Sequence, residues 1–263
     1  MDLDTLREKW DGFAAVFETT FERSTLQLMR TLAANARLDE ASSVLEVGCG
    51  AGGGALEALR FCGEGTAYTG VDLSPEMLRR ARQRLPDRVR LVPCDAADLP
   101  FEDGAFDRVL SNLCLMIVPD TEGVIREIRR VLRPGGILAA SIWGRPERSP
   151  MMTTVPAVVK SLGLALDPPP RSNFHLAGSL RERLLAAGFE QVLVGVQDMP
   201  VDVRDGDDFV RVVLAGHPGW RPWLESLSEG DRSRLYASVS AQVDRELAAG
   251  RFLSLEGQWV VAR

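Results

Sequence analysis

The sequence contains few of the residues from which metal sites and disulfide frameworks are built. Its 263 residues include four cysteines and two histidines. The cysteines are Cys49, Cys62, Cys94 and Cys114. They show no Cys-x-x-Cys spacing, and the two histidines, His175 and His217, are far apart in sequence. We therefore expect no metal site, reduced thiols and, by default, a cytoplasmic protein.

Long hydrophobic runs and a positive net charge are also missing. No apolar run approaches the roughly 20 residues that cross a bilayer, and the start Met1-Asp2-Leu3-Asp4 is acidic where a secretory signal is basic. The net charge of -6 argues against a nucleic-acid partner. A run of arginines from Arg79 to Arg90 has no interleaved aromatic residues, so it favours a solvated helix face over a nucleic-acid patch.

A glycine-rich loop is the most informative feature that is present. Residues 44–55 read Val-Leu-Glu-Val-Gly-Cys-Gly-Ala-Gly-Gly-Gly-Ala, which predicts an apolar strand, a loop almost without side chains, and the start of a helix. Glycine permits positive φ and close approach of a ligand to the backbone. The loop N–H groups would lie at a helix N-terminus. The segment therefore predicts a cofactor-binding loop.

Two classes of cofactor are compatible with this loop. Gly48, Gly50 and Gly53 satisfy the Gly-x-Gly-x-x-Gly pattern that docks a dinucleotide pyrophosphate. Glu46, at the strand end, would face that anion, and it suits a ligand with a cationic part such as S-adenosylmethionine. Glu46 as a solvated strand-end acid is the plainer alternative. Asp72, after the next strand, can accept ribose hydroxyls in either class.

The hydrophobic pattern predicts alternating strands and helices between residues 43 and 142. Predicted strands cover 44–47, 66–71, 89–93, 106–111 and 136–142, and predicted helices cover 55–62, 75–85 and 121–133. Such an order indicates a parallel sheet with helices on both faces. Helices are expected over residues 3–37, where Trp10, Phe13 and Phe17 form an aromatic stripe that either covers the cofactor or packs in the core.

The C-terminal half has a different character. Residues 144–177 are rich in proline and methionine, a helix is expected over 179–187 with a Ser179–Glu182 capping box and Gly188 as its stop, and a long strand is expected over 189–203. Helices over 206–249 and a closing strand over 251–262 follow. We predict N-terminal helices (1–40), a cofactor-binding core (41–143), a cap segment (144–177), and the rest of the core (178–263) with a helical insertion at 206–249.

Five ordered segments carry a resemblance to a known family. They are residues 44–50, 70–78, 94–101, 106–112 and 132–136. In this spacing, residues 10 to about 142 resemble the class I S-adenosylmethionine-dependent methyltransferases, specifically the ubiquinone/menaquinone-biosynthesis-like (methyltransferase type 11) group. The resemblance implies a Rossmann-like, doubly wound, mostly parallel seven-stranded α/β sheet with an antiparallel last strand and a mainly helical cap. It also implies S-adenosyl-L-methionine as the cofactor.

The resemblance also implies which residues contact that cofactor. Gly48, Gly50 and Ala51 would line the methionine part, with Glu46 near its ammonium group and Asp72 on the ribose hydroxyls. Leu73 would lie against the adenine, whose edge Asp95 and Ala96 would contact. The full expected set is Glu46, Gly48, Cys49, Gly50, Ala51, Asp72, Leu73, Met77, Asp95, Ala96, Asn112 and Leu113.

The acceptor side departs from the family pattern. Met116 and Ile117 stand where many relatives carry paired histidines, and Phe17 stands where many carry a tyrosine. For the acceptor we expect contacts from His175, Trp143 and Met151, with His175 either a general base or a structural residue. The cap would form an apolar lid, its own core or a dimer contact.

The functional expectation is methyl transfer to a small, apolar or aromatic molecule, with oxygen slightly ahead of carbon or nitrogen as acceptor. No catalytic residue is identified. The alternatives are a nicotinamide-dependent oxidoreductase and a non-methylating protein that binds S-adenosylmethionine. We expect a monomer or homodimer without nucleic-acid or membrane partners.

Overall fold

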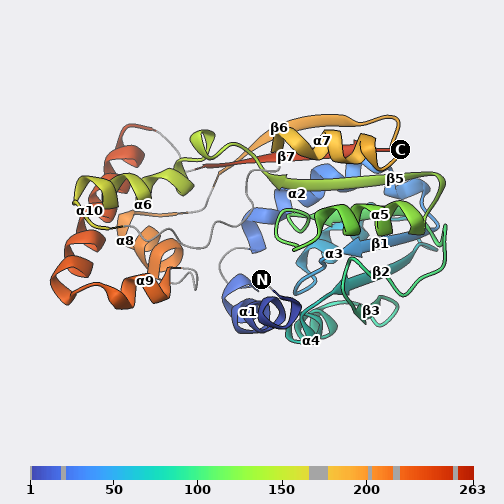
Figure 1. Ribbon diagram of the computed structural model, residues 1–263, viewed down its shortest axis with the longest axis horizontal. Helices are drawn as coiled ribbons and strands as arrows, with labels where there is room; N and C mark the ends of the chain where they lie inside the picture. The colour runs from blue at the N-terminus through green and yellow to red at the C-terminus, as the bar shows by residue number, and fades with distance from the viewer. Residues whose placement is uncertain (1, 19–21, 166–176, 201–202, 216–219, 251–253) are drawn as a thin grey trace. The chain divides into compact units, whose positions relative to one another are not determined.

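A computed structural model describes residues 2–18, 22–165, 177–200, 203–215, 220–250 and 254–263 (Figure 1). The chain divides into two compact units. The core unit comprises Met1–Trp143, Asn173–Gln197 and Gly257–Arg263. The cap unit comprises residues 144–172 and 198–256.

Within the described residues, the central sheet has seven strands in the order β3-β2-β1-β4-β5-β7-β6. Their bounds are β1 Ser43–Val47, β2 Ala67–Asp72, β3 Arg90–Pro93, β4 Phe106–Asn112, β5 Leu132–Trp143, β6 Leu193–Pro200 and β7 Ser254–Ala262. Pairing is parallel from β3 through β5, whereas β5 and β7 are antiparallel. The predicted fold class is confirmed, and the reversal of strand order beside β1 places the ends of β1, β2 and β4 at one edge.

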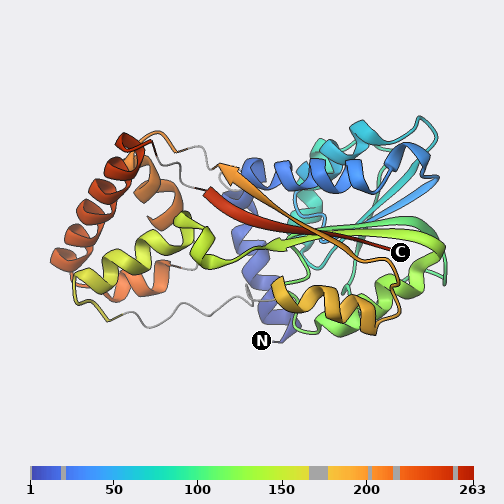
Figure 2. The same ribbon diagram turned by 90° about the horizontal axis from the view of Figure 1, so that it is seen from above.

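Helices cover both faces of this sheet. The core unit contains α1 Leu3–Val16, α2 Glu22–Asn35, α3 Gly53–Ala58, α4 Pro75–Arg84, α5 Thr121–Val131 and α7 Ala177–Ala186. Helices α2 and α3 lie on one face, and α5 and α7 lie on the other (Figures 1 and 2). In α5, Val124, Ile125 and Ile128 recur at helical spacing and are all buried, because that stripe faces the sheet.

The start of α4 follows the sequence signals. Ser74 is the N-cap and its hydroxyl accepts the N–H of Met77 at 3.1 Å, while Pro75 occupies the first helical position. Helix α7 ends at Ala186, and Gly188 is the predicted stop after it, since Gly188 has φ of 88° and the N–H of Phe189 donates to the carbonyl of Leu184.

Several predicted boundaries are wrong. Helix α5 ends at Val131 rather than at residue 133, β5 begins at Leu132 rather than at residue 136, and α3 covers Gly53–Ala58 rather than 55–62. Helix α7 begins at Ala177, before Ser179, so Ser179 is not its N-cap. Strand β6 begins at Leu193 rather than at residue 189. The intervening backbone is used elsewhere: Phe189 completes the helix end, and the N–H of Glu190 donates to the carbonyl of Arg263.

The cap unit has its own hydrophobic core. Its elements are α6 Pro150–Ser161, α8 Gly206–Phe209, a π-helical turn Val210–Ala215, α9 Arg221–Ser226 and α10 Glu229–Ala248. Phe209, Leu235 and Val239 are fully buried in this core. Helix α6 was not predicted from its proline-rich sequence. Pro150 opens it and Pro156 lies within it.

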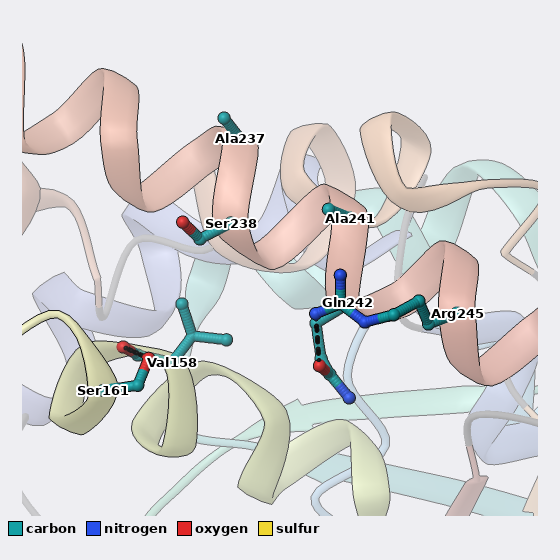
Figure 3. A pocket seen from close by; sticks show the side chains of 7 residues that line it. All are labelled: Val158, Ser161, Ala237, Ser238, Ala241, Gln242 and Arg245. Atoms are coloured by element: carbon teal, nitrogen blue, oxygen red, sulfur yellow. Dashed lines mark hydrogen bonds between the residues drawn. The ribbon is translucent and has the colours of Figure 1, made fainter.

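A hollow of about 370 Å³ lies between α6 and α10 of the cap unit (Figure 3). Its lining consists of Val158, Ser161, Ala237, Ser238, Ala241, Gln242 and Arg245. The Arg245 guanidinium donates to the Gln242 side-chain oxygen at 2.7 Å. None of the expected site residues lines this hollow.

Candidate cofactor site

The glycine loop connects β1 to α3. The N–H groups of Gly48 and Cys49 both donate to the carbonyl of Val71, at 2.9 and 3.0 Å, so the loop folds back over the end of β2. Gly48, Gly50 and Gly52 have φ of 74°, 53° and 86°, the left-handed region in which side chains other than hydrogen are strained. The predicted use of glycine for backbone conformation is therefore found here.

Gly48 is also fixed by the loop that follows β4. A β-carbon at Gly48 would lie 2.5 Å from the Cys114 Sγ. Just before Cys114, Leu113 has φ of 57°, which is unusual for a bulky residue. The N–H of Leu113 donates to the Ser141 carbonyl at 3.0 Å and to its hydroxyl at 3.1 Å, which holds this conformation. Two strained segments thus meet above the strand ends.

Asp72 links the loop to α4. Its Oδ2 accepts the N–H of Gly50 at 2.8 Å, and its Oδ1 accepts the N–H of Ser74 at 2.9 Å. Burial raises the pKa of Asp72 above its ordinary value, the two backbone bonds oppose that shift, and the nearby Asp11 charge adds to it. A carboxylate has about four acceptor positions. Asp72 therefore keeps capacity for hydroxyl donors of a ligand while it holds the loop.

Glu46 points behind the loop rather than into solvent. The residue is only 2% exposed, and its Oε2 accepts a hydrogen bond from the Tyr68 hydroxyl at 2.9 Å. A β-carbon at Gly54 would lie 2.5 Å from Oε1, so the carboxyl sits against the first turn of α3. Burial, with lesser contributions from Asp72 and Glu22, raises the pKa of Glu46 to about 8, against the lowering effect of Tyr68. Glu46 is not a solvated strand-end acid.

Glu22 occupies the amide end of α3. It begins α2, is 6% exposed, and accepts the N–H of Gly53 at 3.1 Å. The Arg84 guanidinium donates to both of its oxygens, at 2.8 and 2.7 Å. Sequence reasoning missed Glu22, because its partners are distant in sequence. A carboxylate at the position where a dinucleotide pyrophosphate would dock weighs against that cofactor class.

The arginine run of α4 is paired within the chain. Arg80 contacts Glu18 at 2.8 Å and Glu76 at 2.9 Å, and Arg84 contacts Glu22. Only part of the run forms the solvated face that was predicted, since Arg79 is half-exposed while Arg80 and Arg84 are largely covered. These pairs join α4 to Glu18, just after α1, and to Glu22, the first residue of α2.

Asp95 lies beside Asp72 at the end of the neighbouring strand. Asp72 pairs with Pro93 in the β2–β3 register, and the N–H of Cys94 donates to the Asp72 carbonyl at 3.2 Å. Asp95 Oδ1 accepts the N–H of Ala97 at 3.0 Å and so turns the chain after β3. The structure therefore brings the loop, Asp72, Asp95 and Ala96 to one edge of the sheet.

Other expected residues are packed against protein groups. Cys49 is buried, and a β-carbon at Gly70 would lie 2.9 Å from its Sγ. Ala51 and Met77 form a buried cluster with Ala14 of α1. Leu73 is half-buried, directly after Asp72.

Asn112 uses its amide to join three elements. Its Oδ1 accepts the Ser141 hydroxyl at 2.6 Å, and its Nδ2 donates to the Thr25 carbonyl at 3.2 Å. The side chain predicted to face the methionine part is therefore engaged with β5 and α2.

The residues expected to contact the acceptor belong to different units or lie outside the described residues. His175 and His217 lie outside the described residues. Trp143 ends β5 in the core unit and its N–H donates to Met116 Sδ at 3.2 Å. Met151 belongs to the cap unit and packs on its hydrophobic core, as do Trp220 and Trp223. These cap residues therefore contribute to the core of the cap unit, one of the alternatives predicted for them.

Neither a metal site nor a membrane span is found in the described ranges. No group of three or more His, Cys, Asp or Glu side chains there could hold a metal ion. No helix in those ranges combines the length and apolar character required to cross a bilayer. The four cysteines are free.

Comparison with known proteins identifies the family. Residues 45–140 match the family model described as "Methyltransferase domain". A demethylmenaquinone methyltransferase of Parafrankia sp. is 31% identical over 226 residues, which cover 72% of this chain and 85% of that protein. A sterol 24-C-methyltransferase of Gibberella zeae is 36% identical over 129 residues, which cover 47% of this chain. The match spans only about a third of that sterol enzyme, at 33%.

A solved structure extends the likeness to most of the fold. The [4+2]-cyclase SpnF matches with a TM-score of 0.57 and 26% identity, over 90% of this chain and 81% of that one. The seven-stranded topology, the glycine loop beside Asp72 and the extent of the match to the Parafrankia enzyme agree. The chain belongs to the class I S-adenosylmethionine-dependent methyltransferases.

Proposed function

We propose that this protein transfers a methyl group from S-adenosylmethionine to a small apolar or aromatic molecule in the cytoplasm. The observation that carries the proposal is the Asp72 carboxylate, which holds the glycine loop through Gly50 and retains acceptor capacity toward a ligand. The Asp72 carboxyl adjoins the loop, and Glu22, paired with Arg84, fills the amide end of α3. This arrangement suits a cationic ligand better than a pyrophosphate. The free cysteines suit a reducing compartment.

Each part of the cofactor then has a candidate partner. Asp72 would accept the ribose hydroxyls, and Gly48 and Gly50 would admit the methionine part to the backbone. Asp95 and Ala96 would contact the adenine edge, with Leu73 against its face, and the buried Met77 would help to shape the site. Because Glu46, Cys49, Ala51, Asn112 and Leu113 bond or pack within the protein, we assign them to shaping the site.

The chemistry requires little more from the protein than alignment. S-adenosylmethionine supplies a methyl group on a sulfonium. When the methyl group is transferred, the sulfur departs as a neutral thioether, which is a good leaving group. Holding two reactants in line can contribute roughly 7–11 kcal/mol to lowering a barrier. The loop and Asp72 would fix the donor, and the acceptor would be held in line with its methyl group. A general base is needed only for an acceptor that must lose a proton early.

We propose oxygen as the first acceptor atom to test. A hydroxyl acceptor needs only to release one proton, whereas an alkene carbon acquires positive charge that the protein must stabilise. The Gibberella relative is named as a carbon methyltransferase, so carbon is the next candidate. Trp143, Met151 and His175 are the residues we propose for acceptor contact, and they require direct testing.

A second candidate function is a reaction in which the same fold binds S-adenosylmethionine without methyl transfer. The solved relative SpnF, named as a [4+2]-cyclase, favours considering it. The two functions differ in one measurable product, because only methyl transfer converts the cofactor to S-adenosylhomocysteine.

The experiment measures binding first and turnover second. Calorimetry should show binding of S-adenosylhomocysteine and none of NAD. Turnover is then followed with methyl-labelled cofactor and a mixture of phenols, quinols and hydroxylated lipids. Binding of NAD in place of S-adenosylhomocysteine would contradict the proposal. Binding together with acceptor conversion but without label transfer would support the second candidate.

A further inference from the structure

A short chain of polar contacts connects the N-terminal helix to the glycine loop. Asp11 of α1 accepts the hydroxyl of Ser74 and, at 3.1 Å, the N–H of Glu76. Ser74 is fully buried, and its own N–H donates to Asp72 at 2.9 Å. Asp72 in turn accepts the N–H of Gly50 at 2.8 Å. Ser74 is therefore the one residue that links Asp11 to Asp72, the carboxylate that holds the loop.

The same helix packs directly on the loop. Ala14 is fully buried against Ala51 and Met77. The Phe17 ring would lie 3.8 Å from a β-carbon at Gly50, and Met77 Sδ would lie 4.0 Å from it. Trp10 packs on the same cluster. The apolar face of α1 thus covers the loop that we assign to the cofactor.

The apolar contacts alone do not fix the position of α1 on the core. Hydrophobic packing is not directional, whereas the two bonds accepted by Asp11 have defined donors at the start of α4. Glu18 adds an ion pair with Arg80 at 2.8 Å at the far end of the helix. Two polar contacts therefore attach this segment to α4, Asp11 within the helix and Glu18 just after its C-terminal end, and Asp11 is the attachment nearer Asp72.

We propose that Asp11 is a positioning residue that holds α1 closed over the cofactor, acting through Ser74. The inference rests on the proposed function and goes beyond it. Cofactor entry and exit would then require Asp11 to release Ser74 and Glu76. Its removal would raise the dissociation rate of bound cofactor even where the contacts to the cofactor itself are unchanged.

The alternative is that Asp11 only completes the N-terminus of α4. If that were its only role, removing Asp11 would lower the stability of the protein without changing the dissociation rate of the cofactor. The two roles therefore separate on a kinetic measurement. Asp11→Asn offers a conservative test, because its amide oxygen can still accept from Ser74 and Glu76, whereas Asp11→Ala removes the acceptor.

The experiment uses the full chain and two readouts. Hydrogen exchange of the α1 amides without ligand reports whether the helix is attached, and stopped-flow displacement reports dissociation of S-adenosylhomocysteine. Asp11→Ala should increase exchange in α1 but not in α5, and speed dissociation about ten-fold, the low end of the effect of losing one hydrogen bond to a charged acceptor. Asp11→Asn should lie between Asp11→Ala and the unchanged chain.

Asp4→Asn is the matched control, since Asp4 is an exposed acid of the same helix that pairs with Arg7. Dissociation in Asp11→Ala equal to that in Asp4→Asn, or unchanged exchange in α1, would overturn the role of Asp11. If the unchanged chain fails to bind S-adenosylhomocysteine, the proposed function is wrong and this role falls with it. Binding with a dissociation rate independent of Asp11 overturns this role alone.

Discussion

Asp72 and Gly50 are joined by a hydrogen bond of 2.8 Å, from the Gly50 N–H to Oδ2 of Asp72. A carboxylate at the end of β2 thereby sets the position of the loop that follows β1. The same side chain fixes the start of α4 through Ser74. Asp72 therefore both holds the glycine loop and the start of α4 in place and is the proposed contact for the ribose.

Replacing Asp72 should abolish cofactor binding. Asp72→Asn places an amide donor against the N–H of Gly50 or Ser74 and removes an acceptor for ribose. Two lost charged hydrogen bonds correspond to about 3 kcal/mol, or a loss of more than about 100-fold in affinity. Calorimetry with S-adenosylhomocysteine provides the measurement. Asp98→Asn, an exposed acid after β3, serves as control, and equal affinity in the two variants would remove Asp72 from the site.

Glu46 should make the stability of the protein depend on pH. Its pKa rises from 4.5 to about 8 on folding, so between these values the folded chain binds a proton that the unfolded chain has lost. The contribution is present below pH 4.5 and disappears as the pH rises through 8. Glu46→Gln should therefore gain stability relative to the unchanged chain across this window, by up to about 4 kcal/mol at pH 8. Urea unfolding at several pH values measures it.

Glu57→Gln is the control for that experiment, with the opposite sign. The Arg30 guanidinium lowers the pKa of Glu57, so its contribution is present above the ordinary carboxyl pKa and is lost as the pH falls. Glu57→Gln should be less stable than the unchanged chain throughout pH 5 to 8, with little change across that range. A flat stability difference for Glu46→Gln would show that Glu46 is ionised in the folded chain.

Gly48→Ala should cost more than a positive φ alone explains. Gly48 and Gly135 have nearly equal φ, 74° and 76°, but only at Gly48 would a β-carbon meet Cys114. Gly135→Ala should lose about 1 kcal/mol from its backbone conformation, and Gly48→Ala about 3 kcal/mol. Combining Gly48→Ala with Cys114→Gly should reduce the loss caused by Gly48→Ala to that of Gly135→Ala, measured against Cys114→Gly alone. Chemical denaturation measures these free energies of unfolding. Equal losses in the two single variants would contradict the crowding.

Removing Arg84 should leave Glu22 buried without its ionic partner. Loss of one member of such a pair typically costs about 3–5 kcal/mol. Arg84→Ala should therefore be strongly destabilising, and Arg84→Met with Glu22→Gln much less so. Arg79→Ala is the matched control, because Arg79 pairs with Glu76 at the surface and its loss should change stability little. Thermal unfolding of these three variants and the unchanged chain measures the effects, and a loss in Arg84→Ala as mild as that in Arg79→Ala would exclude the pair as a structural element.

The sequence predicted what depends on local order. The four residues from Asp72 through Pro75 predict the end of one strand and a proline that opens the next helix, and the structure contains both. The glycine loop likewise needs only its own residues to adopt positive φ. Such features follow from backbone sterics and capping, which a single stretch of sequence contains.

The direction of Glu46 could not be predicted in the same way. Glu46 pairs with Gly70 on β2, and Tyr68 lies on the same face two residues earlier, so the phenol reaches the carboxyl diagonally. That geometry depends on the strand register. The contacts of Asp11 and Glu22 with α4 depend similarly on how distant helices pack. One signal was available: the chain has only two tyrosines, and Tyr68 lies within a predicted buried strand.

The acids around the glycine loop give the proposed reaction an electrostatic direction. Burial is the main reason that the pKa of Asp72 is raised, the Asp11 charge adds to the shift, and a positively charged donor would offset both. Methyl transfer removes the sulfonium charge, so the product is held less strongly than the substrate by the same side chains. Added salt shortens the screening length from about 10 Å at 0.1 M to about 3 Å at 1 M. The affinities of donor and product should therefore converge as ionic strength rises, and product release should be least sensitive to salt.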